Sequence, residues 1–292
     1  MTLWLVRLVW ASLPVTAGPA AGDALDGWST PPRTVAEVFL WSAWAATLVA
    51  VLAPRPIGLT VARVVAPSFV ALAVVVLAGG SADAVAAVVA LVATVVAAAL
   101  ALALPSVSLA CANGIAYGDE RRYPLRTPPV LWLGLLPLAS LLVAAGPVTG
   151  PLLLADGRTA VGIVAPAVGI PAAWFAARSL HSLSGRWAVL VPAGLVIVDP
   201  LTLPDPVLFL RERIEALRAV QRRHRVAAEV LDVRLGARGG SVAMRLDRPV
   251  EFLQTRRGLR GSRPSHATEL CFATVDTPDL LVTAASRRIR VA

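Results

Sequence analysis

Long apolar runs, each close to the length of one membrane crossing, dominate the first 177 residues of the chain. A helix needs about 20 mostly apolar residues to cross the hydrocarbon core of a bilayer, and it satisfies its own backbone hydrogen bonds there. The pattern therefore predicts an α-helical integral membrane bundle of about six transmembrane helices. We place the spans at about residues 3–25, 35–53, 57–78, 84–104, 129–145 and 159–177.

The first apolar run allows three interpretations, because Arg7, Pro14 and Pro19 interrupt it. Residues 1–25 could form a kinked first span, an interfacial helix or a cleaved signal peptide. A signal peptide requires an uninterrupted apolar stretch after its basic start, and Arg7 breaks that stretch. We therefore favour a first span.

The hydrophobic pattern changes to short alternating segments after residue 178, which predicts a small mainly-β domain over residues 178–292. Turn residues between segments indicate one hairpin around Pro192 and Gly194 and another around the glycines at 236–240. Residues 207–219 remain ambiguous between a strand with a turn and a short helix. A terminal helix should begin at Asp276 with Pro278 in its first turn and continue over 279–289. The strand candidates are residues 186–191, 195–199, 229–235, 241–246, 249–254 and 269–274.

Composition supports a membrane protein and excludes several other classes. The chain is 57% hydrophobic and only 15% charged, whereas soluble globular domains carry about 25% charged residues. Its two cysteines exclude a disulfide scaffold. All 27 basic residues are arginine; residues 1–177 carry a net charge of +1 and residues 178–292 carry +8. The basic character thus belongs to the predicted β domain.

Basic residues concentrate in alternate loops between the predicted spans, and such loops face the cytoplasm. This distribution predicts a protein of the bacterial cytoplasmic membrane with both termini and the β domain in the cytoplasm. The arginines that carry the argument are Arg55 and Arg63, then Arg121, Arg122 and Arg126, and finally Arg178 and Arg186.

Clustered arginines are the candidate binding residues. Anionic lipid of the cytoplasmic leaflet attracts such clusters by about 1 kcal/mol per charge, so phospholipid headgroups are the leading partner and an acidic protein partner is the second. Solvated loops whose arginines only fix the topology remain the alternative. A nucleic-acid partner is disfavoured because no aromatic residues interleave the arginines at 218–225 and 256–263, and no recognised binding motif is present. The candidates are Arg121, Arg122, Arg126, Arg222, Arg223, Arg256, Arg257 and Arg260.

The sequence carries no pattern typical of catalysis, and we expect no catalytic residue, metal or cofactor. His181, His224 and His266 lack the spacing of metal ligands, and no phosphate-binding or nucleophile motif occurs. Three of the predicted spans, and residues 38–53 of a fourth, contain no charged residue, which disfavours ion-coupled transport. A scaffold or accessory subunit is the leading hypothesis, a small-solute permease is the alternative, and a membrane-embedded transferase is third.

Two segments, 116–126 (AYGDERRYPLR) and 185–206 (GRWAVLVPAGLVIVDPLTLPDP), resemble an uncharacterised family of multi-pass membrane proteins from actinobacteria. The order of short strands followed by a helix, placed after membrane spans, also resembles the pleckstrin-homology-like domains of bacterial membrane proteins. These resemblances imply a membrane location and a small barrel or bent sheet closed by a helix. They imply no activity.

Overall fold

The computed structural model describes residues 2–78, 84–131, 135–220, 230–237, 239–255, 261–275 and 278–286. The chain forms two compact units, of which the first holds Met1–Val107 with Leu135–His181 and the second holds Ser108–Gly134 with Ser182–Ala292. The division predicted at residue 177 differs from this grouping chiefly in residues 108–134, which join the second unit although apolar helices flank them on both sides.

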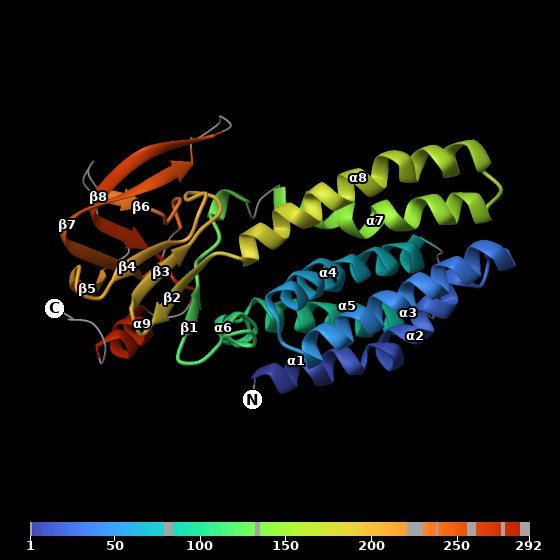
Figure 1. The fold of residues 1–292 in the computed structure, drawn as a ribbon. Coiled ribbons are helices and arrows are strands. Elements are labelled where there is room, and N and C mark those ends of the chain that lie inside the picture. The colour runs from blue at the N-terminus through green and yellow to red at the C-terminus, as the bar shows by residue number, and fades with distance from the viewer. Residues whose placement is uncertain are drawn as a thin grey trace. The chain divides into compact units, whose positions relative to one another are not determined.

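The first unit is built from long apolar helices (Figure 1). Among the described residues, five segments are long and apolar enough to cross a membrane: Leu3–Leu25, Thr30–Leu52, Val85–Ala103, Leu135–Ala155 and Thr159–Ser184. The helices are α1 (Thr2–Ala11), α2 (Leu13–Leu25), α3 (Thr30–Leu52), α4 (Pro56–Ala78), α5 (Ala84–Ala103), α7 (Leu135–Ala155) and α8 (Thr159–Ser184).

One of the predicted spans matches its helix closely and another differs. The span predicted at 57–78 corresponds to α4, which covers Pro56–Ala78. The span predicted at 129–145 corresponds to α7, which continues to Ala155 with Pro147 inside it. α7 packs closely against α8 in this continuation. A Cβ atom at Gly146 would lie only 2.6 Å from the carbonyl oxygen of Gly169 in α8, so the close contact requires glycine. Small residues permit such close approach of helices in lipid.

Arginines of α1 and α4 bind the ends of neighbouring helices. Arg7 donates to the carbonyls of Val51 and Leu52 at the end of α3, both at 3.1 Å. Arg63 donates twice to the carbonyl of Leu102 near the end of α5, at 3.2 and 2.9 Å. The last carbonyls of a helix lack partners within it and carry partial negative charge, so these guanidinium groups stabilise both helix ends.

The second unit contains two four-stranded sheets around one core. The first sheet has the order β1-β2-β3-β4 and is antiparallel throughout; the second has the order β5-β7-β8-β6 with only β6 and β8 parallel. The strands are β1 (Arg121–Pro124), β2 (Trp187–Val191), β3 (Gly194–Val198), β4 (Val207–Leu210), β5 (Ile214–Val220), β6 (Val230–Asp232), β7 (Ser241–Thr255) and β8 (Ser262–Phe272).

The predicted hairpin around Gly194 is confirmed as β2 and β3, whereas the hairpin predicted around the glycines at 236–240 is wrong. The strand before those glycines, β6, is only three residues long and pairs in parallel with β8, while β7 pairs with β5 and β8. The ambiguous segment 207–219 resolves into two strands, β4 and β5, that belong to different sheets. The second strand of the unit's long hairpin, β8, begins well before the segment predicted at 269–274.

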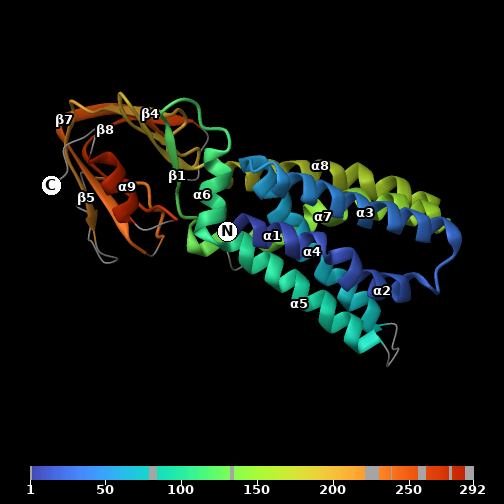
Figure 2. The same cartoon turned by 90° about the horizontal axis from the view of Figure 1, so that it is seen from below.

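A short helix, α9 (Pro278–Ala285), lies beside β5 and β7 (Figure 2). Its Leu281 and Ala285 are buried in the core, to which both sheets contribute. The helix starts with Pro278 as its first residue, where a missing N–H costs nothing. Residues 287–289 of the predicted terminal helix lie outside the described residues. The mainly-β character predicted for this part of the chain is confirmed.

The remaining helical pieces, α6 (Pro105–Asn113) and a 3₁₀ turn at Pro129–Leu131, flank β1 in sequence. β1 pairs with β2 along its whole length, from Arg121 opposite Leu190 to Pro124 opposite Trp187. The sheet therefore takes its first strand from a segment about 60 residues before the second. No local pattern in the loop 105–127 predicted this strand.

Candidate functional site: the first sheet and its basic margin

The first sheet has apolar residues on both of its faces. Tyr123, Ala188, Leu195 and Phe209 point from it into the core. The strand register places the alternate residues of β2, β3 and β4 together on the opposite side. We call this side the apolar face; its residues are Trp187, Val189, Val191, Val196, Val198, Leu208 and Leu210.

Within the described structure the apolar face is open at β4, whereas Val189 of β2 is only 6% exposed. Leu208 and Leu210 are 44% and 43% exposed, and Val191, Val196 and Val198 are half-buried. Antiparallel sheets that meet water on one side normally alternate apolar and polar residues. The strands WAVLV, GLVIV and VLFL contain no polar residue at all. The face therefore has the composition of a surface that meets an apolar environment.

Arg122 of β1 forms a basic margin at the edge of the apolar face. The guanidinium of Arg122 lies 4.9 Å from the centre of the Trp187 ring, a cation–π geometry. Arg122 also donates to Oε1 of Glu120 at 2.7 Å, and the indole N–H of Trp187 donates to the carbonyl of Ser184 at 2.9 Å. Arg122, Glu120 and Trp187 thus form one connected group at the edge of the sheet.

The carboxyl of Glu120 stays ionised in this group. Partial burial acts to raise its pKa, but the backbone N–H of Tyr117 and the guanidinium of Arg122 outweigh that effect and lower the pKa. The backbone of Arg122 is held as well, because the side-chain amide of Asn113 accepts from its N–H and donates to its carbonyl. Asn113, the chain's single asparagine, ends α6 and fixes the start of β1.

Arg126 belongs to residues 108–134, the segment that supplies β1, and it binds the chain directly after β8 of the second sheet. Its Nε donates to the carbonyl of Thr274 at 2.7 Å, and its own N–H donates to the carbonyl of Ala273. Leu125 beside it forms a bridge with Thr274. Of the three arginines predicted in this loop, Arg126 and Arg122 thus have partners within the protein, whereas Arg121 is exposed.

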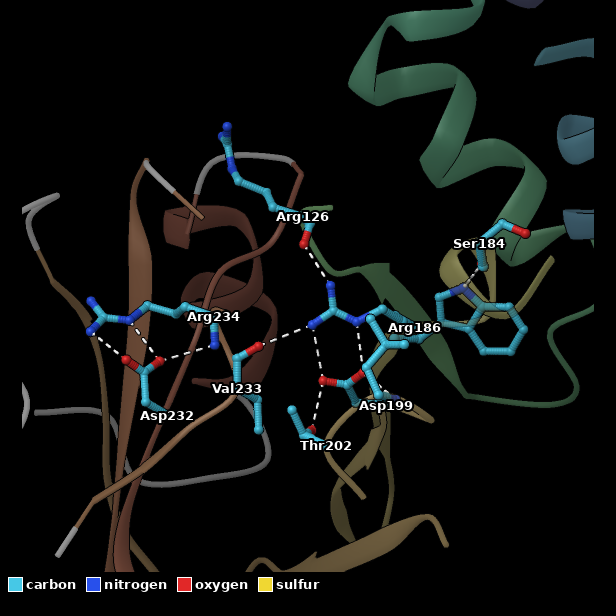
Figure 3. A network of polar contacts seen from close by, with 10 residues as sticks. Arg126, Ser184, Arg186, Asp199, Thr202, Asp232, Val233 and Arg234 are labelled. Carbon is cyan, nitrogen blue, oxygen red and sulfur yellow. Dashed lines mark hydrogen bonds and ion pairs between the residues drawn. The ribbon is translucent and has the colours of Figure 1, made fainter. Parts of the chain in front are cut away.

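Arg186 and Asp199 form a buried ion pair in the same domain (Figure 3). Arg186 donates bidentately to Asp199, with Nε–Oδ1 at 2.6 Å and Nη2–Oδ2 at 2.9 Å, and both side chains have no exposed surface. Arg186 also donates to the carbonyls of Arg126 and Val233, and Asp199 accepts from the hydroxyl of Thr202. A buried pair is tolerated when its remaining polar atoms are bonded in this way. The pair links three distant chain segments.

Sequence reasoning placed Arg186 among the loop charges that fix topology, whereas the structure buries it. The signal that could have found the pair is Asp199, an acid that directly follows an apolar strand and precedes Pro200 in a turn. A second bidentate pair, Arg234 with Asp232, is partly exposed, and its two members lie two positions apart in the sequence.

The other predicted binding residues, Arg222, Arg223, Arg256, Arg257 and Arg260, lie outside the described residues, so a lipid contact by them stays a prediction. The last three fall between β7 and β8, whose residues Thr255 and Ser262 pair with each other. Arg263, next to that pair, is exposed. The arginine-rich segment is thus the connection of the longest hairpin of the domain.

The described part of the chain contains no group of three or more His, Cys, Asp or Glu side chains that could hold a metal ion. Cys271 is fully buried, and this burial raises the pKa of its thiol to about 11, so the thiol is neutral at physiological pH. The chain matches no protein-family model, and comparison with curated proteins and with solved structures likewise gives no match.

Proposed function

We propose that the chain is a multi-pass protein of the bacterial plasma membrane that acts as a scaffold or accessory subunit. In this proposal the β domain faces the cytoplasm and contacts anionic phospholipid headgroups through its arginines. The helices anchor the protein, and the domain presents a surface at the membrane for a further protein. The proposal includes no catalytic step.

The observation that carries the proposal is the way in which the basic domain is connected to the apolar helices. The second unit holds 21 arginines against 13 acidic residues, a net charge of +8, while the first unit has a net charge of +1. The chain passes between the two units three times, at residues 107–108, 134–135 and 181–182. A domain with three short connections to membrane-crossing helices is confined to the membrane surface, where its charge attracts anionic lipid.

The full chain in lipid nanodiscs provides the test, because removing the helices would also remove β1 from the sheet. We would attach an environment-sensitive fluorophore at Ser262→Cys, an exposed position at the base of the arginine-rich connection. Raising the phosphatidylglycerol content from zero to one third should increase quenching of the fluorophore by spin-labelled lipid. High salt should reverse this increase, because it screens exposed charges.

A charge-matched pair of variants identifies the residues responsible. Reversal of Arg256, Arg257 and Arg260 to Glu should abolish the response to anionic lipid. The control reverses Arg218, Arg245 and Arg248, which are exposed on the same domain, and changes the net charge equally. Equal loss in both triple variants would contradict a local contact, and an absence of response in the unmodified chain would contradict the lipid proposal.

The scaffold role requires a protein partner, which purification of the tagged chain in mild detergent should recover. The same partner should appear in independent preparations and disappear when the β domain is disrupted by Asp199→Asn. Recovery of the chain alone in every preparation would contradict the scaffold role and leave the lipid contact intact.

A further inference from the structure

The apolar face contrasts with the exposed part of the outer face of the second sheet, which carries charged side chains. There Glu215 and Arg245 form an ion pair at 2.8 Å, with side chains 50% and 61% exposed. The corresponding positions of the first sheet are valines and leucines. An apolar patch that is exposed at Leu208 and Leu210 and half-buried at the neighbouring valines marks a contact with another protein or with a membrane.

We infer that the apolar face lies against the lipid bilayer, at the level of the headgroups and the upper acyl chains. This inference deepens the proposed function and rests on its membrane location. It names a particular surface of the β domain as the one that meets lipid, and that surface differs from the arginine-rich connection between β7 and β8.

Chain connectivity favours lipid as the occupant of this face. Trp187, the first residue of β2, follows the last residue of α8 by three positions, and three residues span at most about 10 Å. β1 is likewise bounded in sequence by α6 and by the short segment that leads to α7. The sheet with the apolar outer face is therefore joined through β2 to the membrane-length helix α8, whereas no strand of the second sheet adjoins such a helix in sequence.

The residues at the border of the face also fit a membrane interface. Indole rings prefer the headgroup region, and arginine places its apolar stem in the acyl layer while its guanidinium reaches phosphate. Trp187 stacks with Arg122 at one edge of the face, and Arg211, which is exposed, directly follows Leu210 at the other. Apolar residues in the centre with tryptophan and arginine at the border match the layers of a bilayer surface.

The test again uses the full chain in nanodiscs. A fluorophore attached at Leu208→Cys reports on the apolar face, and one at Glu215→Cys reports on the second sheet at a similar starting exposure. Cys111 and Cys271 are both buried, so the unsubstituted chain measures background labelling. Lipid carrying a nitroxide near the headgroup should quench the fluorophore at 208 several-fold more than the one at 215, and aqueous iodide should show the opposite order.

Leu210→Cys provides a second reporter if the substitution at 208 disturbs folding. Equal iodide quenching at 208 and 215 would overturn the inference, because the face would then be in water. Protection from iodide without quenching by nitroxide lipid would also overturn it, because a protein or a second copy of the chain would then cover the face. Nanodiscs that contain one copy of the chain distinguish those two occupants.

The headgroup contact in the proposed function and the lipid contact of the apolar face can be contradicted independently. A response to anionic lipid at Ser262 together with an iodide-accessible Leu208 would contradict this inference and leave the proposed headgroup contact standing. Nitroxide quenching at Leu208 without any effect of phosphatidylglycerol at Ser262 would support the apolar contact and contradict the electrostatic one.

Discussion

The two sheets of the β domain share one core but differ on their outer faces. The first carries only apolar side chains across β2, β3 and β4, and the second carries an exposed pair of charges at Glu215 and Arg245. Both sheets bury their inner faces equally well, so the inner face reveals nothing about their surroundings. The outer face is informative, because its side chains are polar where the sheet borders water and apolar where it borders an apolar environment.

The sheets also differ in how the chain assembles them. The second is formed from one stretch of sequence, Ile214 to Phe272, with most of its pairing within the β7–β8 hairpin. The first takes β1 from a segment before α7 and β2 from a segment after α8. Such distant pairing is costly in chain entropy and needs specific contacts to secure it. In this sheet the buried pair Arg186–Asp199 supplies them.

The largest effect is expected from removing β1. A fragment of residues 182–292 lacks the partner strand of β2, the core residues Tyr123 and Leu125, and the carbonyl of Arg126 that Arg186 binds. We expect this fragment not to unfold cooperatively in denaturant, as measured by circular dichroism. Co-expression with residues 108–131 should restore a cooperative transition. Cooperative unfolding of the fragment by itself would show that the first sheet does not depend on its inserted strand.

The next largest effect should follow from Asp199→Asn, which leaves the Arg186 charge buried without a counter-ion. Loss of one member of a buried pair costs about 3–5 kcal/mol, because the remaining charge is neither solvated nor compensated. Hydrogen exchange of the β2 and β3 amides in the full chain would measure this loss as a fall in opening free energy.

The matched control is Asp232→Asn, which removes the other bidentate partner of an arginine in the same domain. Asp232 is 37% exposed, whereas Asp199 has no exposed surface. We therefore expect a smaller loss than at Asp199, because water already solvates part of the Asp232 carboxyl. Equal effects of the two substitutions would contradict the special role of the Arg186–Asp199 pair in the first sheet.

These differences explain which parts of the structure could be predicted from the sequence. Apolar runs and local alternation predicted the helices and the β2–β3 hairpin, because each of these elements forms between residues close in the chain. β1 could not be predicted, since Arg121–Pro124 has no alternation of its own and becomes a strand only beside β2. Arg186 was misplaced for the same reason, because its partners lie 13, 47 and 60 residues away.

The candidate site was predicted only in part. Arg121, Arg122 and Arg126 were identified by their concentration between two apolar runs, but sequence reasoning could not distinguish the exposed Arg121 from Arg122, which pairs with Glu120. The apolar face was missed because its valines and leucines, taken strand by strand, resemble the buried strands of any core. Only the register of β2, β3 and β4 separates the residues that face the core from those that face outward.

A smaller effect is expected at Cys271 on the second sheet. The fold raises the pKa of this thiol from 9.0 to about 11, so folding favours the neutral form. This contribution to stability is complete below pH 9 and is lost as the pH rises through 11, in total about 3 kcal/mol for two pKa units at about 1.4 kcal/mol each. The Tm of the wild type should therefore fall more steeply between pH 9 and 11 than that of Cys271→Ala. Parallel pH profiles would contradict the raised pKa.

The smallest effect should come from Glu215→Gln, which breaks the exposed pair with Arg245 on the outer face of the second sheet. Pairs in water contribute little, because solvent and salt screen them and both side chains lose freedom on pairing. We expect a change of less than about 0.5 kcal/mol in the opening free energy of β5 and β7, measured by hydrogen exchange. A change above about 1 kcal/mol would mean that this pair is shielded from water. The second sheet would then also be covered, and the contrast between the two outer faces would no longer identify the membrane-facing side of the domain.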